Sequence, residues 1–317
     1  MAVAARVDPK SFFAPQDWAR LTARSDLMGV ALVVHAWIVI GLAIAMALVW
    51  PITIPLAVMI VGGRQLGLAI LMHDAAHGAL CRNLKLNDWV GEHLTPGGLF
   101  KYRPYHLQHH KFAQQSEDPD LVLSAPFPIT RLSLRRKIVR DLTGQTWLKL
   151  RWGQVVAELK GRRPGQPVWP ILAAELRRKR RFLIGGVLMT AALAPFGYWW
   201  AWPVLWVLPA ATWLQMITRL RNIAEHACVA RDEPDPLRHA RTTRANLIER
   251  AVLAPYWVNY HCEHHMFMHL PCYSLPKAHR LLRRGGVTER MEVAPGYLDV
   301  IRMASSKSAR AAAPAAA

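Results

Sequence analysis

The chain alternates between long apolar segments and long polar, basic segments. Four apolar segments predict membrane-spanning helices, at residues 27–50, 54–72, 182–202 and 203–220. At about 1.5 Å per residue, a helix over the first segment is roughly 36 Å long, which is enough to cross a bilayer. A short proline-containing turn joins the first two segments, and the last two follow each other directly. The pattern therefore predicts two membrane hairpins.

The charge of the chain supports this membrane arrangement. The formal net charge is +19, although 52% of the residues are hydrophobic and the mean hydropathy is +0.10. Lysine and arginine gather in residues 1–26, in residues 73–181 and toward the C-terminus, while Arg64 interrupts the second segment. Cytoplasmic loops of membrane proteins are enriched in these residues, so we expect a bacterial inner-membrane protein with both termini in the cytoplasm. Anionic lipid headgroups account for the charge, so we expect no nucleic-acid partner.

The same pattern predicts three parts of the chain. Residues 1–26 form a cytosolic N-terminal segment, and residues 303–317 form a low-complexity tail that we expect to be disordered. Residues 27–302 form the membrane domain, with cytosolic parts at 73–181 and 221–302. The first apolar run is too long for a signal peptide, so we expect it to remain as an anchor. The four cysteines form no C-x-x-C pair, and we expect reduced thiols.

Histidines cluster beside the predicted spans. The second span ends in HDAAH, where a spacing of four residues places both imidazoles on one helix face. HLQHH and HCEHH repeat spacings of three and four residues, and RNIAEH follows the fourth span. If these helices continue beyond the bilayer and converge, their imidazoles can meet in one cavity. The nine candidate ligands are His73, His77, His106, His109, His110, His226, His261, His264 and His265.

Nine imidazoles indicate two metal ions rather than one. A tetrahedral zinc ion uses four ligands or fewer, whereas two metals with four or five ligands each would use nine. Imidazole binds Zn, Cu, Fe and Ni, so the ligand type alone does not identify the metal. The Glu-x-x-His pairs of soluble diiron bundles are missing from this sequence, which favours an all-nitrogen site. Asn222, one turn before His226, is a further candidate ligand, directly or through water.

Several polar residues lie next to these candidate ligands. A carboxylate that accepts the N–H of the second ring nitrogen fixes the tautomer and orientation of a ligand histidine. For the two aspartates around Pro119, a loop turn is the alternative role. Of the other histidines, His93, His239 and His279 are expected at the surface or behind the ligands. The candidate supporting carboxylates are Asp74, Asp118, Asp120, Glu225 and Glu263.

The motifs HDAAH, HLQHH followed by EDPD, RNIAEH and NYHCEHHMFMHLP resemble those of the integral-membrane fatty acid desaturase and hydroxylase superfamily. The resemblance covers about residues 27–285. It implies a non-heme diiron centre that uses O₂ and two electrons to attack an unactivated C–H bond. It also implies that the nine histidines are iron ligands and that Asn222 contacts an iron through water. The first box is H-x-x-x-H, where some members have one more residue, and this spacing does not identify the substrate.

The expected fold class is therefore an all-α integral membrane protein. Four transmembrane helices form two hairpins, and a cytosolic helical domain that holds the histidine-rich dimetal site caps them. The expected activity is O₂-dependent introduction of a double bond into fatty acyl chains of membrane lipids. A hydroxylase or ketolase of the same superfamily, acting on lipid or carotenoid, is the alternative. A membrane zinc hydrolase or a metal transporter is a more distant alternative, although transport would place histidines inside the spans.

The source of electrons lies outside this sequence. We find no flavin, heme or iron–sulfur motif, and the G-x-G-x-x-G dinucleotide fingerprint is missing. We therefore expect a separate electron carrier, such as a ferredoxin or a cytochrome b-type protein. An acidic carrier would suit the basic cytoplasmic face.

Overall fold

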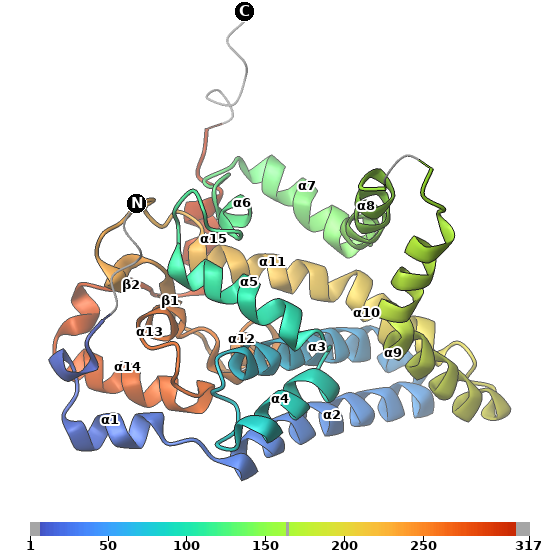
Figure 1. Cartoon of the computed structure of the whole chain (residues 1–317), viewed down its shortest axis with the longest axis horizontal. Coiled ribbons are helices and arrows are strands. Elements are labelled where there is room, and N and C mark those ends of the chain that lie inside the picture. Colours follow the sequence, from blue (N-terminus) through green and yellow to red (C-terminus); the bar gives the residue numbers. More distant parts are fainter. Residues whose placement is uncertain (1–6, 163–164, 309–317) are drawn as a thin grey trace, which may run out of the picture. The chain divides into compact units, whose positions relative to one another are not determined.

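The computed structural model describes residues 7–162 and 165–308, which are mostly helical (Figure 1). The first helices are α1 (Pro15–Thr22), α2 (Asp26–Val49), α3 (Ile54–Ala76), α4 (Leu84–His93), α5 (Leu99–Lys111) and α6 (Leu121–Ser124). The central helices are α7 (Arg131–Leu142), α8 (Gln145–Lys160), α9 (Trp169–Leu193), α10 (Leu208–Ala211) and α11 (Trp213–His226). The C-terminal elements are β1 (Arg241–Thr243), α12 (Leu247–Val252), α13 (His261–Met266), α14 (Leu275–Arg284), β2 (Glu292–Ala294) and α15 (Tyr297–Ala304).

The chain divides into two compact units. Unit 1 comprises Met1–Ile38, Gly63–Arg135 and Ile217–Ala317, within the described residues. Unit 2 comprises Val39–Gly62 and Arg136–Met216. All nine candidate ligands and the five candidate supporting carboxylates therefore belong to unit 1. The site can be built from the contacts of this unit alone.

Two of the four predicted spans are helices long and apolar enough to cross a membrane, and the four-span arrangement is not confirmed. These two helices cover Asp26–Val49 and Pro51–Ala76, close to the predicted bounds. The third predicted span is interrupted because α9 ends at Leu193 and Gly197 adopts a left-handed conformation (φ 84°). The apolar part of α9 is also short, since the basic stretch ELRRKRR lies in its first half.

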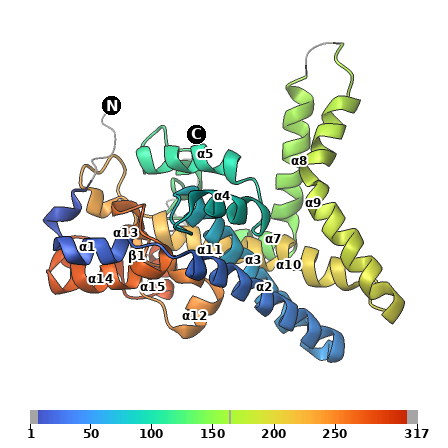
Figure 2. The same ribbon diagram turned by 60° about the horizontal axis from the view of Figure 1, so that its bottom comes forward.

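The fourth predicted span is divided into three helical pieces. A π-helical segment covers Pro203–Val207, and α10 ends before Thr212, whose backbone leaves the helical region (φ −122°, ψ −81°). Pro209 accounts for the boundary between the π-helical segment and α10, because a proline removes a backbone donor and crowds the preceding turn. Within unit 2, α8 and α9 run side by side (Figure 2).

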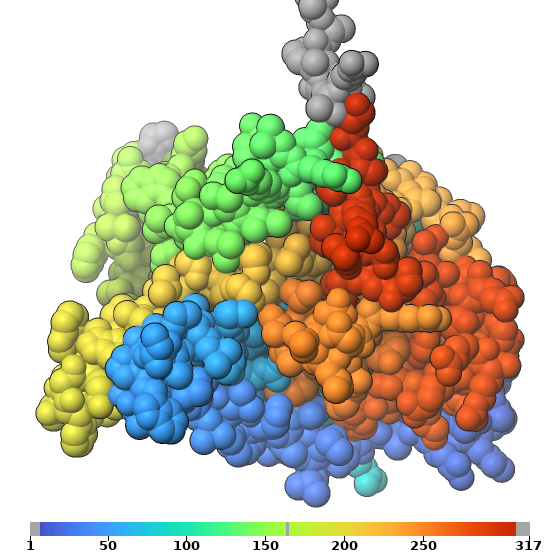
Figure 3. All heavy atoms as spheres, turned by 180° about the vertical axis from the view of Figure 1, so that it is seen from behind, coloured from blue at the N-terminus to red at the C-terminus, as the bar shows by residue number. Residues whose placement is uncertain are grey.

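Unit 1 encloses its core between helices from both ends of the chain. The packing of α1 against α14 joins the N-terminal and C-terminal regions (Figure 2). β1 and β2 form a short parallel pair, and the backbone of Thr242 in β1 also bridges Tyr260, just before α13. Seen from behind, the C-terminal segments of this unit, coloured orange to red, lie next to one another at the surface (Figure 3). Fully buried leucines such as Leu71, Leu270 and Leu282 each contribute about 1.5–3 kcal/mol of hydrophobic stabilisation.

The boundary predicted for the disordered tail needs a correction. Met303 and Ala304 complete α15, and Ser306 bridges Thr130 in an antiparallel arrangement. Lys307 also donates its backbone N–H to the carbonyl of Ile129. Backbone pairing of this kind keeps residues 306 and 307 in place, so the predicted disorder does not apply to them. The rest of the predicted tail, residues 309–317, lies outside the described residues.

Gly67 allows the Tyr256 ring to pack against α3, so we predict that Gly67→Ala destabilises the protein. A Cβ atom at Gly67 would lie 2.7 Å from the Tyr256 ring, closer than carbon atoms can approach. Overpacking of this kind costs about 1–3 kcal/mol. Thermal or denaturant unfolding in detergent would measure the loss. Gly41→Ala is the matched control, since a Cβ atom there meets nothing within 4 Å. Equal stability of the two variants would contradict the close packing.

Candidate metal centre

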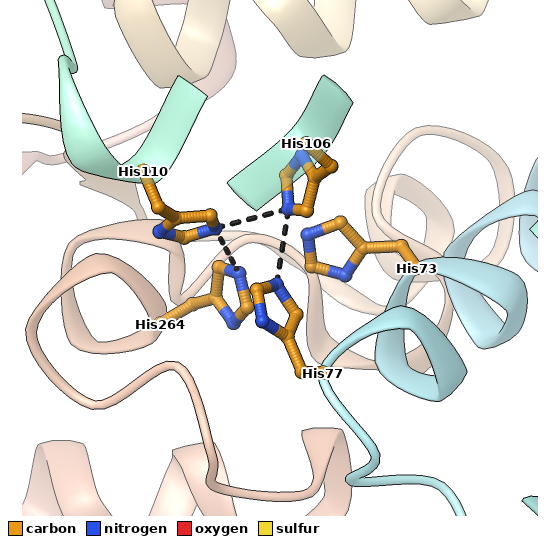
Figure 4. Close-up of side chains that lie close together, drawn as sticks. All are labelled: His73, His77, His106, His110 and His264. Atoms are coloured by element: carbon orange, nitrogen blue, oxygen red, sulfur yellow. Dashed lines mark hydrogen bonds between the residues drawn. The ribbon is translucent and has the colours of Figure 1, made fainter. Parts of the chain in front are cut away.

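Four helices bring the nine predicted histidines together in two groups. The first group contains five side chains and the second contains four, and within each group the ligand atoms all lie within 4.8 Å of one another. His73 and His77 come from the end of α3, three histidines come from α5, His226 ends α11, and three come from α13. Figure 4 shows the first group, with the five imidazoles turned toward one another. The groups are His73, His77, His106, His110 and His264, and His109, His226, His261 and His265.

The ring nitrogens that face each other are spaced as metal ligands would be. In the first group, His106 Nε2 lies 3.0 Å from Nε2 of both His77 and His110. In the second group, His261 Nε2 lies 2.9 Å from His226 Nε2 and 3.2 Å from His265 Nε2. With metal–nitrogen bonds of about 2.1 Å, ligands at right angles are about 3.0 Å apart and tetrahedral ligands about 3.4 Å apart. Both groups fit a metal ion with right-angled ligand pairs.

The local sequence explains why α3 presents its histidines at its end. His73 lies in the last turn of α3, and His77 follows directly after the helix, with its N–H pointing back to the carbonyls of His73 and Asp74. Gly78 then adopts a left-handed conformation (φ 65°), which glycine reaches without a steric penalty and which ends the helix. The chain leaves the helix there, so both imidazoles stay beside the first group.

The third histidine box, HCEHH at residues 261–265, is held in place by its own carboxylate, Glu263. Glu263 is completely buried, and its Oε1 lies 2.5 Å from His279 Nδ1 in α14. Thr242 in β1 donates its hydroxyl to Oε2 of the same carboxylate. Glu263 therefore anchors α13 to β1 and α14, and it does not contact a ligand nitrogen directly. His279 contacts Glu263 and not a ligand histidine, so it lies behind the ligands as predicted.

Asp118 connects a ligand histidine to the loop that follows α5. Its Oδ1 lies 2.8 Å from His109 Nδ1, and its oxygens accept backbone N–H groups from Gln114 and Asp120. The carboxylate is buried, so these three contacts supply the hydrogen bonds that water would otherwise make. Asp118 can therefore hold His109 with Nδ1 protonated and Nε2 free for a metal.

Asp74 connects the first histidine box, HDAAH at residues 73–77, to the segment that follows α13. Its Oδ2 accepts the backbone N–H of Cys272 at 2.8 Å. Its Oδ1 lies 3.6 Å from His73 Nδ1, which is close enough for electrostatic attraction and longer than a hydrogen bond. Asp74 therefore fixes the position of α3 relative to the chain that leaves α13.

Two of the other predicted polar residues pair with side chains that are not candidate ligands. Asp120 accepts the Tyr105 hydroxyl at 2.5 Å. Glu225 forms a two-fold hydrogen-bonded ion pair with Arg221, at 2.6 and 2.7 Å, and its Oε2 lies 3.6 Å from His261 Nε2. The carboxylate of Glu225 thus places negative charge beside the second group.

Asn222 lies one turn before His226 in α11 and is partly exposed, while His226 itself is buried. Its role as a ligand stays a prediction.

Burial favours the neutral form of seven of the nine candidate ligands. It lowers the pKa values of seven of the nine imidazoles well below the ordinary value, and neighbouring histidines lower them further. A neutral imidazole has a lone pair for a metal, whereas a protonated imidazole has none. The seven are His77, His106, His110, His226, His261, His264 and His265.

Sequence reasoning missed two side chains next to the ligands. Gln114 is buried, and its amide reaches His226. Tyr102 stacks on the His106 ring, with centroids 5.1 Å apart and planes 10° from parallel. Tyr102 lies four residues before His106, so helical spacing alone could have identified it. No sequence signal identifies Gln114, because its contact depends on a loop conformation.

Two histidine groups carried by helices define a protein with a site compatible with two metal ions. The model of the family described as fatty acid desaturase matches residues 48–293, so the chain belongs to the fatty acid desaturase family. The chain is also 27% identical, over 259 residues, to the dihydrorhizobitoxine desaturase of Bradyrhizobium elkanii. That match covers 78% of this chain and 70% of the relative. The protein is therefore a desaturase-like oxidoreductase with a buried histidine site compatible with two metal ions.

The lowered pKa values predict that the metal-free protein loses stability on acidification. The unfolded chain takes up protons as the pH falls below about 6.5, while the buried imidazoles of the folded chain stay neutral. Each such group lowers the free energy of unfolding by up to about 1.4 kcal/mol per pH unit in this range. Denaturant unfolding in detergent between pH 8 and pH 5 would measure the effect. A stability that stays constant or increases below pH 6.5 would contradict the neutral state of the cluster.

Proposed function

We propose that the protein is an O₂-dependent diiron desaturase that introduces a double bond into fatty acyl chains of membrane lipids. The observation that carries the proposal is the pair of buried histidine groups, five and four side chains, with ring nitrogens 2.9–3.2 Å apart. Family membership supports the reaction type. The two long apolar helices support a lipid environment for the substrate.

The spacing of the nitrogens favours a metal with right-angled ligand pairs, such as iron, over a tetrahedral structural zinc. Zinc in a structural site prefers four tetrahedral ligands, with nitrogens about 3.4 Å apart for bonds of about 2.1 Å. The shorter separations here, and the five members of the first group, suit a metal with right-angled ligand pairs. Imidazole is also an ordinary ligand for iron. A zinc hydrolase would use fewer ligands, so we consider it the weaker candidate.

The residues of this chain would hold the irons and control their surroundings. When bound, the two irons would supply the redox chemistry that an unactivated C–H bond requires and that acid–base side chains cannot supply. The nine imidazoles would bind as neutral donors, and Asp118 would keep His109 in the tautomer that binds through Nε2. Burial of both groups would keep bulk water away from the irons.

The proposed reaction balances with an external source of electrons. Removing two hydrogen atoms from neighbouring carbons yields two electrons and two protons as the double bond forms. Reducing O₂ to two water molecules takes four electrons and four protons. The electron carrier therefore supplies two electrons and the solvent supplies two protons. A hydroxylation would instead keep one oxygen atom in the product.

The relative named above provides a second candidate substrate. Its name says that it acts on dihydrorhizobitoxine. At 27% identity, this relative supports a shared reaction type more strongly than a shared substrate. Dihydrorhizobitoxine should therefore be tested beside the acyl lipids.

We predict that a host expressing the protein accumulates acyl chains lighter by two hydrogen atoms, and that His110→Ala abolishes this change. His110 belongs to the first group, and its Nε2 lies 3.0 Å from His106 Nε2 and 3.1 Å from His264 Nε2. Removing it should also lower the iron content. Mass spectrometry of total lipids and of metal in the purified protein would measure both. His93→Ala is the matched control, because His93 belongs to neither group.

The outcomes separate the candidates. A product heavier by one oxygen atom would indicate a hydroxylase or ketolase. Unchanged lipids together with conversion of added dihydrorhizobitoxine would move the proposal to the second substrate. A purified protein that takes up zinc and no iron would overturn the diiron centre.

We further propose that the electron carrier is a separate acidic protein, of the ferredoxin or cytochrome b type, and that the basic exposed face of α14 receives it. Arg280, Arg283 and Arg284 are exposed on α14, and the other face of this helix holds His279 against Glu263 of the third box. Exposed charges mainly accelerate association, and salt screens them. We therefore predict that carrier-dependent turnover slows as ionic strength increases, and that replacing the three arginines by glutamine removes this dependence. Turnover that is insensitive to salt in the wild-type protein would contradict an acidic carrier.

A further inference from the structure

We propose that Gln114 is a positioning residue of the metal centre, whose side-chain oxygen accepts the Nδ1 hydrogen of His226 and thereby presents Nε2 of this imidazole to the metal. The inference rests on the proposed metal centre and concerns the second histidine group. Gln114 lies in the loop between α5 and α6, and His226 ends α11. The proposal gives this loop a chemical role in addition to connecting two helices.

The contact between the two side chains is buried and close. Gln114 is only 3% exposed. Its amide nitrogen lies 3.3 Å from His226 Nδ1 and 3.4 Å from the His226 carbonyl oxygen, and its amide oxygen lies 3.4 Å from the Ser124 hydroxyl. The backbone of His239 also interacts with this imidazole, and Gln114 is the side chain that contacts its Nδ1. The orientation of the Gln114 amide therefore contributes to which ring nitrogen carries the hydrogen.

The chemistry of a metal ligand requires the opposite orientation of this amide. A neutral imidazole carries one N–H and one lone pair. His226 Nε2 points into the second group, 2.9 Å from His261 Nε2, so Nε2 is the nitrogen that must keep its lone pair. Nδ1 then carries the hydrogen and needs an acceptor. The amide nitrogen cannot accept a hydrogen bond, whereas the amide oxygen can.

Turning the Gln114 amide by half a revolution gives His226 Nδ1 an acceptor, and it replaces the weak 3.4 Å hydrogen bond from the amide nitrogen to the His226 carbonyl oxygen. The oxygen and nitrogen of a glutamine amide have nearly the same size, so the turn leaves the packing unchanged. The oxygen then accepts from His226 Nδ1, and the nitrogen donates to the Ser124 hydroxyl oxygen. The Ser124 hydroxyl can donate in turn to the carbonyl of Leu121, 3.3 Å away. Metal binding thus selects one of two amide orientations.

Few of the candidate ligands have such a partner. Among the described residues, the Nδ1 atoms of five candidate ligands are buried without a hydrogen-bond partner, whereas Nδ1 of His109 and of His226 each contacts a polar side chain. The partners of these two, Asp118 and Gln114, come from one loop. The five without a partner are His73, His77, His110, His261 and His265.

The loop itself is built to hold this arrangement. Gln114 adopts a left-handed backbone (φ 62°), which is unusual for a residue other than glycine and persists only where surrounding contacts enforce it. Its N–H donates to Asp118 Oδ2 at 2.9 Å, while Asp118 Oδ1 contacts His109 Nδ1. One carboxylate and one amide therefore orient a ligand on α5 and a ligand on α11 together.

The test compares two substitutions that differ in one property. Gln114→Met keeps the length of the side chain and removes the amide acceptor, whereas Gln114→Glu keeps an acceptor for His226 Nδ1. Each full-length variant would be purified in detergent, loaded anaerobically with ferrous iron and analysed for iron per chain. Loss of the group that hydrogen-bonds a ligand histidine lowers metal affinity by about 10- to 100-fold. We expect Gln114→Met to release iron from the second group faster in the presence of a chelator, and Gln114→Glu to retain it.

Controls keep this test independent of activity and of folding. Gln115→Met removes a neighbouring amide that lacks the contact with His226, and it should release iron at the wild-type rate. If Gln114→Met fails to fold, Gln114→Leu tests the same acceptor. Equal iron release by the methionine and glutamate variants would overturn the proposal, because the loop conformation would then matter and the acceptor would not. Retention of all iron by both variants would also overturn it. A wild-type protein that binds no iron would refute the metal centre itself, and with it this inference.

Discussion

The structure depends on holding nine imidazoles in two groups, eight of them buried, with facing nitrogens about as close as ligands of one ion. Facing nitrogens lie 2.9–3.2 Å apart in both groups. Lone pairs at this distance repel one another unless a proton or a cation lies between them, and burial removes the water that would otherwise screen them. A folded chain can hold such an arrangement only if other interactions fix each helix that carries a histidine. The geometry of the metal centre therefore depends on the rigidity of unit 1.

Buried carboxylates fix several of these helices, mostly through hydrogen bonds to parts of the chain other than the ligand histidines. Asp74 ties the end of α3 to the backbone of Cys272, and Glu263 ties α13 to Thr242 and His279. Both carboxylates neighbour ligands in the sequence yet bond to other parts of the chain. Successive side chains on a helix point about 100° apart, so a residue next to a ligand necessarily faces a different neighbour. This geometry lets each box bind a metal on one side and the scaffold on the other.

The same geometry explains what the sequence could and could not predict. Spacings of three and four residues predicted which histidines of one motif lie near each other, because helical periodicity is local, but not their division into two groups, which separates His109 from His106 and His110. The sequence predicted that Asp118 supports a ligand histidine. It did not predict the loop conformation that directs Asp118 to His109. Gln114 could not be found, since its reach to His226 depends on a left-handed residue and on a contact across 112 positions. The last two predicted spans looked continuous by hydropathy, whereas a proline, Gly197 and the arginines of α9 divide or shorten them.

The division of the chain into two units has a consequence for how such proteins diversify. Every candidate ligand, its carboxylate anchors and the Gln114 loop belong to unit 1, and residues 39–62 and 136–216 contribute none of them. Within unit 2, residues 54–62 begin α3 and residues 213–216 begin α11, the helices that carry His73 and His226. Substitutions elsewhere in unit 2 leave the sequence of every helix that carries a candidate ligand unchanged, so this part of the chain can vary while the residues that would bind metal stay the same.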